Sequence, residues 1–390
     1  MSTAKGHCDP AFEAVKQLLS DNVASDTELG ACVCVNVDGK NVVDIWDGYI
    51  DKDKTIDWQE NSIINVWSCS KTVTNLAVLI CHDRGLLDVN EPIAKYWPEF
   101  AENGKKDIPV KHILSHSTGL AGWENADNVS LEDVCDPTKS TPPLAKQAPW
   151  WTPGTASGYH AMNQGHLAGE LVRRVTGKTL KQFIAEDIAG PLGADFQLGA
   201  VEKDWDRIST LLAPPSLVDT TGASLDPNSV AMRALTNPGG SAEFALGPEW
   251  RRGEVGAANG HGNARALVRI LSIITRGGEV DGVKLLSPQT IDLIFQEQTN
   301  GMDLVLGKPI RFGIGYGLPL PEFVPMIREG RVCFWGGWGG SSIIMDLDRK
   351  LTISYVMNKM GAGTVGNPRT EGYINTIYDC VAKMGGERKA

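Results

Sequence analysis

Segments with the pattern of β-strands lie near the two ends of this 390-residue chain, and helix-like segments fill the region between them. Five apolar runs have the strand pattern: residues 30–37, 41–49, 333–338, 341–346 and 351–358. The first two are joined at Asp38-Gly39, a dipeptide typical of a tight hairpin turn. We therefore expect an α+β fold, in which an antiparallel sheet is built from both termini, flanked by helices and joined to a mostly helical insertion.

This order of segments also predicts the domain organisation. Residues 1–62 and 270–390 would form an α/β domain around the antiparallel sheet, and residues 63–269 would form a mostly helical domain. The active site would lie in the cleft between the two domains. Within the helical domain, apolar spacing predicts a helix over residues 159–176.

Composition excludes several classes of partner. The formal net charge is −10 and no basic run offsets it, which argues against nucleic acid and against anionic membranes. No stretch approaches the roughly 18 apolar residues of a membrane span, and the N-terminus lacks the apolar core of a secretory signal. The eight cysteines, the histidines and the carboxylates show neither disulfide-framework nor metal-ligand spacing. We expect a cytoplasmic protein with free thiols and neither metal nor cofactor.

Ser68 and Lys71 lie three residues apart at the start of a helix predicted to run toward Arg84. At that spacing both side chains project from one face of the helix, and the free amides of the first turn favour negative charge near the serine. A desolvated lysine can take the proton of a serine hydroxyl and make it a nucleophile. The alternative is a serine N-cap followed by an exposed lysine.

Two further stretches carry chemically useful groups. A turn over residues 151–158 leads to Tyr159, and a phenol near a cationic lysine is stabilised as a phenolate that can shuttle a proton. The alternative is a packed tyrosine with a satisfied hydroxyl. Residues 334–341 contain four glycines, which weaken a strand unless something approaches its backbone closely, as a substrate carbonyl does at amide donors. The alternative is a glycine-rich hairpin packed against two tryptophans.

In this order and at these separations, the three stretches resemble the motifs of the serine β-lactamase and penicillin-binding protein superfamily. The likeness is closest to class C β-lactamases and family VIII carboxylesterases, and it extends from about residue 30 to about residue 360. The resemblance implies that Ser68 is the nucleophile that forms an acyl-enzyme, with Lys71 as base or proton relay. It implies that Tyr159 protonates the leaving group and later activates water.

The resemblance also places the third motif at Trp335-Gly336-Gly337, a stretch that binds substrate in this superfamily. The backbone amides of the nucleophile and of Trp338 would then form the oxyanion hole. Trp-Gly-Gly occurs twice in succession, so a shift of three residues would move the second donor to Ser341. The longer strand pattern favours Trp338.

The chain departs from the superfamily pattern at two positions. The second motif is usually Tyr-x-Asn, but here it is Tyr159-His160-Ala161, and Asn163 is the residue that could partly substitute for the missing asparagine. Trp335 replaces the lysine that holds the carboxylate of a β-lactam or a peptide. Both departures favour neutral esters over charged lactams.

Other residues are predicted to line or neighbour the pocket. Trp150 and Trp151, with the two tryptophans of the glycine-rich stretch, would wall an apolar acyl or alcohol pocket. His160 and His261 would be neighbours of that pocket, and His160 and Trp151 are included among the expected substrate-binding residues. His116 is expected to be a buried, hydrogen-bonded histidine, and the alternative is a pairing with an adjacent serine.

The predicted function is a serine hydrolase that cleaves small or medium-chain carboxylic esters through an acyl-serine intermediate. Acyl transfer to a natural-product alcohol is an alternative, as is a peptidase or weak β-lactamase activity. An inactive scaffold with the penicillin-binding fold is the non-enzymatic alternative. The sequence contains no Gly-x-Ser-x-Gly segment, which excludes the α/β-hydrolase route to a serine esterase. The expected partner is a small-molecule ester.

Overall fold

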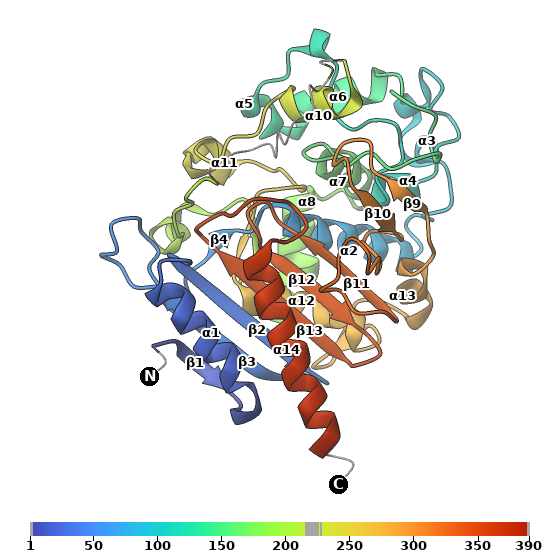
Figure 1. Ribbon diagram of the computed structural model, residues 1–390. Helices are drawn as coiled ribbons and strands as arrows, with labels where there is room; N and C mark the ends of the chain where they lie inside the picture. Colours follow the sequence, from blue (N-terminus) through green and yellow to red (C-terminus); the bar gives the residue numbers. More distant parts are fainter. Residues whose placement is uncertain (1–2, 215–225, 227, 388–390) are drawn as a thin grey trace.

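The computed structural model describes residues 3–214, 226 and 228–387, and it contains one large antiparallel sheet (Figure 1). The strand order of this sheet is β1-β3-β2-β13-β12-β11. Its strands are β1 (Lys5–Cys8), β2 (Gly30–Val37), β3 (Lys40–Gly48), β11 (Val332–Gly336), β12 (Ser342–Asp346) and β13 (Leu351–Met357). The two ends of the chain meet where β2 pairs with β13, with Val33 opposite Tyr355. The predicted sheet built from both termini is confirmed.

The turn between β2 and β3 shows why this hairpin was recognisable. Asp38 has a φ of 49° and Gly39 has a φ of 92°. Two successive positive φ values are the requirement of a type I′ turn, which Asp-Gly satisfies at low conformational cost.

Helices cover both faces of the large sheet. α1 (Glu13–Ala24) and α14 (Pro368–Glu387) run side by side across one face, and α12 (Ala264–Thr275) packs on the other (Figure 1). On the first face, Tyr355 lies against Tyr373 of α14, with ring centroids 4.6 Å apart. On the second, the Thr352 hydroxyl lies 2.8 Å from that of Thr275. Positions 352 and 355 differ by an odd number, so their side chains leave β13 on opposite faces.

The remaining helices lie between β3 and β11 in the chain, and they include α2, the helix that follows Ser68. They are α2 (Ser70–Asp83), α3 (Ile93–Tyr96), α4 (Lys111–Leu114), α5 (Leu131–Val134), α6 (Pro137–Lys146), α7 (Gln164–Thr176), α8 (Leu180–Phe183), α9 (Gly190–Leu192), α10 (Val230–Thr236), α11 (Pro248–Arg252) and α13 (Pro288–Ile294). Every residue of α2 from Ser70 to Cys81 is buried. A helix buried all round is held in place from every side, which makes it a rigid base for a site. Within the described residues, we find no helix with the length and apolar character needed to cross a membrane.

Three small sheets complete the fold. They are β4 (Ile64–Asn65), β6 (Gly260–Gly262) and β5 (Gln197–Leu198); β9 (Thr299–Met302) and β10 (Pro309–Phe312); and β7 (Glu279–Val280) and β8 (Val283–Lys284). The first of these sheets was not predicted, and it places β6 beside the segment that leads to Ser68. The division into residues 1–62 with 270–390 and residues 63–269 stays a proposal. Its boundary at 269/270 falls inside α12, a helix that packs on the large sheet.

The helix predicted over residues 159–176 is shorter at its N-terminal end. α7 begins at Gln164, so Tyr159 lies in the segment before the helix. The backbone amide of Tyr159 donates to Asp303, and that of His160 donates to His116 Nδ1, at 3.0 and 3.1 Å. Both amides would lack a helical acceptor at the start of a helix that began at Tyr159, and here residues distant in the chain accept from them.

Candidate active site

Ser68 lies in a strained turn directly before α2. A 3-10 turn over Trp67–Cys69 precedes the helix, and Trp67 has a φ of 50°, in the left-handed region that bulky side chains avoid. Ser70 holds this turn, because its hydroxyl donates to the Trp67 carbonyl at 2.5 Å and accepts from the Gly260 amide at 2.8 Å. Trp67 and Cys69 are buried, whereas Ser68 keeps partial exposure. The turn therefore presents one serine from an otherwise buried segment.

Lys71 is almost completely buried, with 1% of its surface exposed, and three oxygen atoms surround its amine. Its Nζ lies 3.1 Å from Ser68 Oγ, 2.7 Å from the Ala161 carbonyl oxygen and 2.9 Å from the Ala257 carbonyl oxygen. No carboxylate of the described residues pairs with it. Burial lowers the pKa of Lys71 well below the usual value of a lysine, because a desolvated ammonium is costly.

Tyr159 lies against Lys71 and contacts the third motif. The lysine Nζ is 4.7 Å from the centroid of the tyrosine ring, and Trp335 Nε1 donates to the tyrosine hydroxyl at 3.0 Å. Tyr159 and Trp335 are 2% and 3% exposed. The structure therefore brings the serine, lysine, tyrosine and first tryptophan of the three motifs into one contiguous cluster.

The sequence predicted that a cationic lysine stabilises Tyr159 as a phenolate, and the structure does not favour this. Burial raises the pKa of Tyr159, and hydrogen bonding by Ser68 and Trp335 only partly opposes that rise. Lys71 approaches the face of the ring, so its amine does not sit on the phenol oxygen as the prediction required. Tyr159 is thus a protonated phenol beside an amine of lowered pKa.

At the glycines of the third motif, backbone atoms of other segments occupy the space that a side chain would need. A Cβ on Gly337 would lie 2.5 Å from the carbonyl oxygen of Val66, and one on Gly336 would lie 2.8 Å from that of Thr364. The end of β11 therefore packs directly on the segment before Ser68. Trp338 follows at once, with its ring centroid 4.9 Å from that of Trp67.

Two backbone amides are left free at this contact. Within the described part of the chain, the N–H groups of Ser68 and Trp338 donate to no protein acceptor. The Gly337 amide, in contrast, donates to the Ser341 carbonyl at 2.7 Å and closes the turn after β11. Free amides beside a partly exposed serine are the donors that a developing oxyanion requires.

His160 and Asn163 differ from their predicted roles. His160 is fully buried, its Nδ1 lies 2.6 Å from the Gly158 carbonyl, and its Nε2 lies 2.7 Å from the Thr118 hydroxyl. Both ring nitrogens are therefore occupied within the protein, so His160 is not available to bind substrate in this structure. Burial lowers its pKa to about 4. Asn163 is also fully buried and donates to the Leu120 carbonyl at 2.7 Å.

The Asn163 side chain does not replace the missing asparagine toward the lysine. The position that this asparagine would take at Lys71 Nζ is filled by the carbonyl oxygen of Ala161. A backbone carbonyl accepts from an amine as well as an amide side chain does. The change from asparagine to alanine in the second motif therefore leaves the lysine fully hydrogen-bonded.

The structure also places the other residues for which the sequence predicted an environment, namely Trp151, His116 and His261. Trp151 is partly exposed, and its Nε1 donates to the Ala156 carbonyl at 3.1 Å. His116 is a buried histidine whose ring centroid lies 4.8 Å from that of Tyr159, so the predicted buried histidine is found. His261 is fully buried in β6, with Nδ1 2.8 Å from the Asn259 carbonyl.

A second apolar cluster surrounds Tyr159 and Trp335 and is separate from the main core. We call it the apolar wall; its buried members are Ala121, Tyr159, Ala234, Val305, Ile310, Phe312 and Trp335, and its partly buried members are Trp150, Trp151, Ala161, Val230, Leu306 and Val365. The wall contains no charged side chain. It is continuous with the reacting groups, because Tyr159, Trp335 and Ala161 belong to both.

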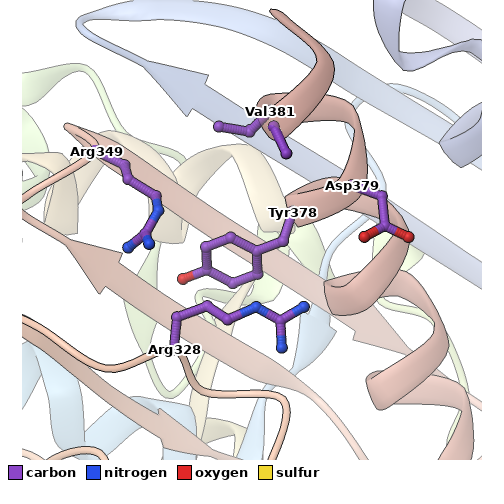
Figure 2. Close-up of a pocket in the computed structure, with 6 residues that line it drawn as sticks. Arg328, Arg349, Tyr378, Asp379 and Val381 are labelled. Carbon is purple, nitrogen blue, oxygen red and sulfur yellow. The ribbon is translucent and has the colours of Figure 1, made fainter. Parts of the chain in front are cut away.

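A hollow of about 380 Å³ lies elsewhere, at the C-terminal helix (Figure 2). Its lining is Arg328, Arg349, Tyr378, Asp379, Val381 and Ala382. Figure 2 shows Tyr378 between the two arginines, and the tyrosine hydroxyl donates to Asp346 at 3.1 Å. None of the residues predicted for the site lines this hollow.

Three groups of the site could not be found from side-chain patterns. Ala161 and Ala257 contribute only carbonyl oxygens, and every residue type carries one. Asp303 accepts from the amide of Tyr159 and sits between β9 and β10. The sequence around Asp303 indicates a turn, because aspartate and glycine are frequent there, but a turn signal does not identify a distant partner.

Comparisons with known proteins agree with this geometry. A family described as Beta-lactamase matches residues 15–373. The protein "Esterase/beta-lactamase LipL" of Mycobacterium tuberculosis is 30% identical over 365 residues, which cover 91% of this chain and 83% of LipL. Among solved structures, a family VIII carboxylesterase is 33% identical with a TM-score of 0.86, over 97% of this chain and 99% of the other.

A penicillin-binding protein homologue from Caulobacter crescentus is also 33% identical, with a TM-score of 0.89 over 97% of this chain and all of the other. The family and the fold predicted from the three motifs are therefore confirmed. This chain belongs to the β-lactamase family and shares its fold with a family VIII carboxylesterase and a penicillin-binding protein homologue.

Proposed function

We propose that this protein is an esterase that cleaves neutral carboxylic esters with an apolar acyl or alcohol group, through an acyl intermediate on Ser68. The observation that carries the proposal is the environment of Lys71: a buried amine with lowered pKa, 3.1 Å from a strained and partly exposed serine hydroxyl. The class of enzyme, a serine esterase or acyltransferase, agrees with the relatives described above.

The two carbonyl oxygens beside Lys71 orient its neutral form. A neutral amine has two hydrogens and one lone pair. With the hydrogens donated to the Ala161 and Ala257 carbonyls, the lone pair faces Ser68 Oγ. The serine proton then moves to Lys71 Nζ as Oγ bonds to the ester carbonyl carbon. Lys71 is therefore the general base of acylation.

The charge that develops on the carbonyl oxygen would be stabilised by the Ser68 and Trp338 amides. Both amides lie where the end of β11 packs on the turn that contains Ser68, and this packing depends on Gly336 and Gly337. The same packing supports Trp338 over Ser341 as the second donor, because Ser341 lies across the turn that follows.

Collapse of the tetrahedral intermediate breaks the bond between the carbonyl carbon and the alcohol oxygen, which must gain a proton. Tyr159 supplies it from its phenol and regains one from the Lys71 ammonium through Ser68 Oγ, the oxygen that hydrogen-bonds both side chains. Burial raises the pKa of Tyr159, which keeps the phenol protonated between turnovers. In deacylation, water or a second alcohol attacks the acyl carbon and gives its proton to the neutral Lys71 amine. The bond between the acyl carbon and Ser68 Oγ then breaks, and Oγ takes that proton from Lys71.

Trp335 and the apolar wall set the preference for neutral esters. The indole that replaces the superfamily's lysine donates to Tyr159, so it offers no cation to a substrate carboxylate. The partly buried wall residues, among them Trp150, Trp151 and Leu306, offer apolar contacts to an acyl or alcohol group. The cation nearest to these residues, Arg233 over the Trp150 ring, is paired with Glu124 at 2.7 Å. A charged β-lactam or a peptide carboxylate would therefore have to compete with Glu124, which makes lactamase and peptidase activity weak.

The test is hydrolysis of p-nitrophenyl esters from acetate to decanoate, combined with intact-protein mass spectrometry. We expect turnover of the neutral esters, an acyl adduct on Ser68 and at least a 10³-fold lower rate for Ser68→Ala. A folded wild-type protein that neither hydrolyses these esters nor reacts with a fluorophosphonate would contradict the proposal and favour the inactive scaffold.

The same assay separates hydrolysis from acyl transfer and from lactamase activity. Added small alcohols that capture the acyl group faster than water does would identify a transferase. Nitrocefin hydrolysis that exceeds ester hydrolysis in kcat/KM would overturn the preference for neutral esters. The small-molecule substrate and the cytoplasmic location expected from the sequence belong to the same proposal.

A further inference from the structure

Asp303 is a buried carboxylate at the edge of the site, at the position where β9 ends. Its side chain is fully buried, and no lysine, arginine or histidine of the described residues forms an ion pair with it. One carboxylate oxygen, Oδ1, accepts three backbone amides. The other, Oδ2, is buried without a partner among the described residues. An unpaired buried carboxylate oxygen is costly, so it requires an explanation.

The three amides come from two different parts of the site. Val305 and Leu306 donate to Oδ1 at 2.9 Å each, which is the usual pattern of an aspartate at the start of a turn. The third donor is the amide of Tyr159, at 3.0 Å and 144 positions away in the chain. A second hydrogen bond, from the Leu304 amide to the Ser157 carbonyl at 2.9 Å, joins the same two segments.

These bonds connect the reacting tyrosine to the substrate wall. Val305 and Leu306 belong to the apolar wall, and Val305 is only 4% exposed. Tyr159 precedes α7, so no helical hydrogen bond fixes its backbone. One carboxylate oxygen therefore links the backbone of the tyrosine directly to the wall, beside the hydrogen bond between Leu304 and Ser157.

We propose that Asp303 is a positioning residue that sets both the rate of proton transfer by Tyr159 and the selectivity for acyl chain length. This inference rests on the proposed function and goes beyond it, because it assigns selectivity to a residue that touches neither substrate nor nucleophile. Oδ1 holds the tyrosine and the wall in register, because it accepts the amides of Tyr159, Val305 and Leu306 at once.

The test compares Asp303→Ala and Asp303→Asn in the full-length protein, using acetate and octanoate p-nitrophenyl esters. Asp303→Ala removes all three acceptor bonds. We expect kcat to fall at least 30-fold on both esters, and the octanoate-to-acetate ratio of kcat/KM to fall toward one. Asp303→Asn keeps a carbonyl oxygen for the three amides, so we expect it to restore that ratio to within threefold of wild type.

Asp83→Ala is the matched control, because Asp83 Oδ1 also accepts three hydrogen bonds, from the amide and hydroxyl of Ser287 and the hydroxyl of Thr290. It lies at the opposite end of α2 from Ser68. We expect the control to lose thermal stability with an unchanged chain-length ratio. The inference is overturned if Asp303→Ala loses stability and keeps the wild-type ratio, as the control does.

If Asp303→Ala does not fold, Asp303→Glu decides the question, since it keeps the charge and moves the acceptor by one methylene. A changed ratio supports the inference, and an unchanged ratio overturns it. A wild-type protein without esterase activity would instead refute the proposed function, so the two failures are distinguishable.

Discussion

Two buried lysines in this molecule have nearly the same surroundings and different consequences. Lys71 is 1% exposed and Lys105 is 0% exposed. Each donates to two backbone carbonyls, those of Ala161 and Ala257 for Lys71 and those of Glu102 and Gln147 for Lys105. Each also lies over an aromatic ring, at 4.7 and 5.3 Å from the centroid.

The two lysines differ in whether a hydroxyl contacts the amine and in which aromatic ring lies beside it. Lys71 has the Ser68 hydroxyl at 3.1 Å and lies over a tyrosine, whereas Lys105 has no hydroxyl partner among the described residues and lies over Phe100. Burial lowers the pKa of both amines, to about 8 for Lys105. A buried amine that donates to backbone carbonyls thus links two segments of the chain. It can act as a base only where a nucleophile faces its lone pair.

Replacement of each lysine by methionine gives the largest expected contrast. Lys71→Met removes the base, so we expect kcat/KM on neutral esters to fall by about 10³- to 10⁴-fold. Lys105→Met leaves the carbonyl of the buried Gln147 without its donor and should cost about 2 kcal/mol of unfolding free energy, with activity within threefold of wild type. Ester kinetics and urea denaturation measure the two effects. Similar kinetic losses in both variants would show that the comparison is wrong.

Exchanging the rings tests the second difference. Tyr159→Phe gives Lys71 the same kind of ring that Lys105 has, and it removes the phenol that relays the proton to the leaving group. We expect kcat to fall by about 10²- to 10³-fold with a small change in KM. Phe100→Tyr at the other lysine should leave kcat unchanged. A Tyr159→Phe variant that retains wild-type kcat would remove the tyrosine from the mechanism.

A smaller effect is expected from Trp335→Phe. This change deletes the N–H that donates to the Tyr159 hydroxyl and keeps most of the apolar contact. The loss of one neutral hydrogen bond is worth about 1 kcal/mol, so kcat should fall about fivefold. β-Lactam turnover should stay low, because phenylalanine restores no cation. A gain of nitrocefin hydrolysis in this variant would contradict the role given to the indole.

The smallest effect is a pH dependence of stability that belongs to Lys105. Its pKa is about 8 in the folded protein and 10.5 in its ordinary state. Between these values the unfolded chain holds one more proton than the folded one, so unfolding becomes harder as pH rises. The stability of wild type minus that of Lys105→Met should therefore be constant below pH 8 and rise up to about pH 10.5. A difference that falls over this interval would refute the lowered pKa.

Much of the fold could be predicted because its signals are local. The hairpin at Asp38-Gly39 depends on two positive φ values that the dipeptide favours, and α12 begins at an Asn263 cap and ends before Gly277. The predicted start of α7 was wrong: the helix begins at Gln164, and the segment before it is held by distant residues such as Asp303, which accepts the Tyr159 amide. Such a choice is decided by residues far along the chain.

The site was predictable where the chemistry resides in side chains. Ser68, Lys71, Tyr159 and Trp335 carry recognisable groups in a recognisable order, and the structure brings them together. The substrate-binding roles predicted for His160 and Asn163 stay predictions that this structure does not favour, because both side chains are buried and hydrogen-bonded to other parts of the protein. The carbonyls that hold Lys71 left no trace in the sequence, since backbone groups are common to all residues.

The most direct test of the account is the titration of the Lys71 amine, followed by NMR of protein labelled at the lysine Cε carbon. Lys71→Met and Lys105→Met assign the two shifted resonances. We predict that Lys71 titrates well below 10.5 and that the rate of Ser68 acylation falls as pH drops through the same pKa, because protonation removes the base. A Lys71 amine that titrates near 10.5 would contradict the account. So would an acylation rate that stays constant over the pH range in which Lys71 titrates.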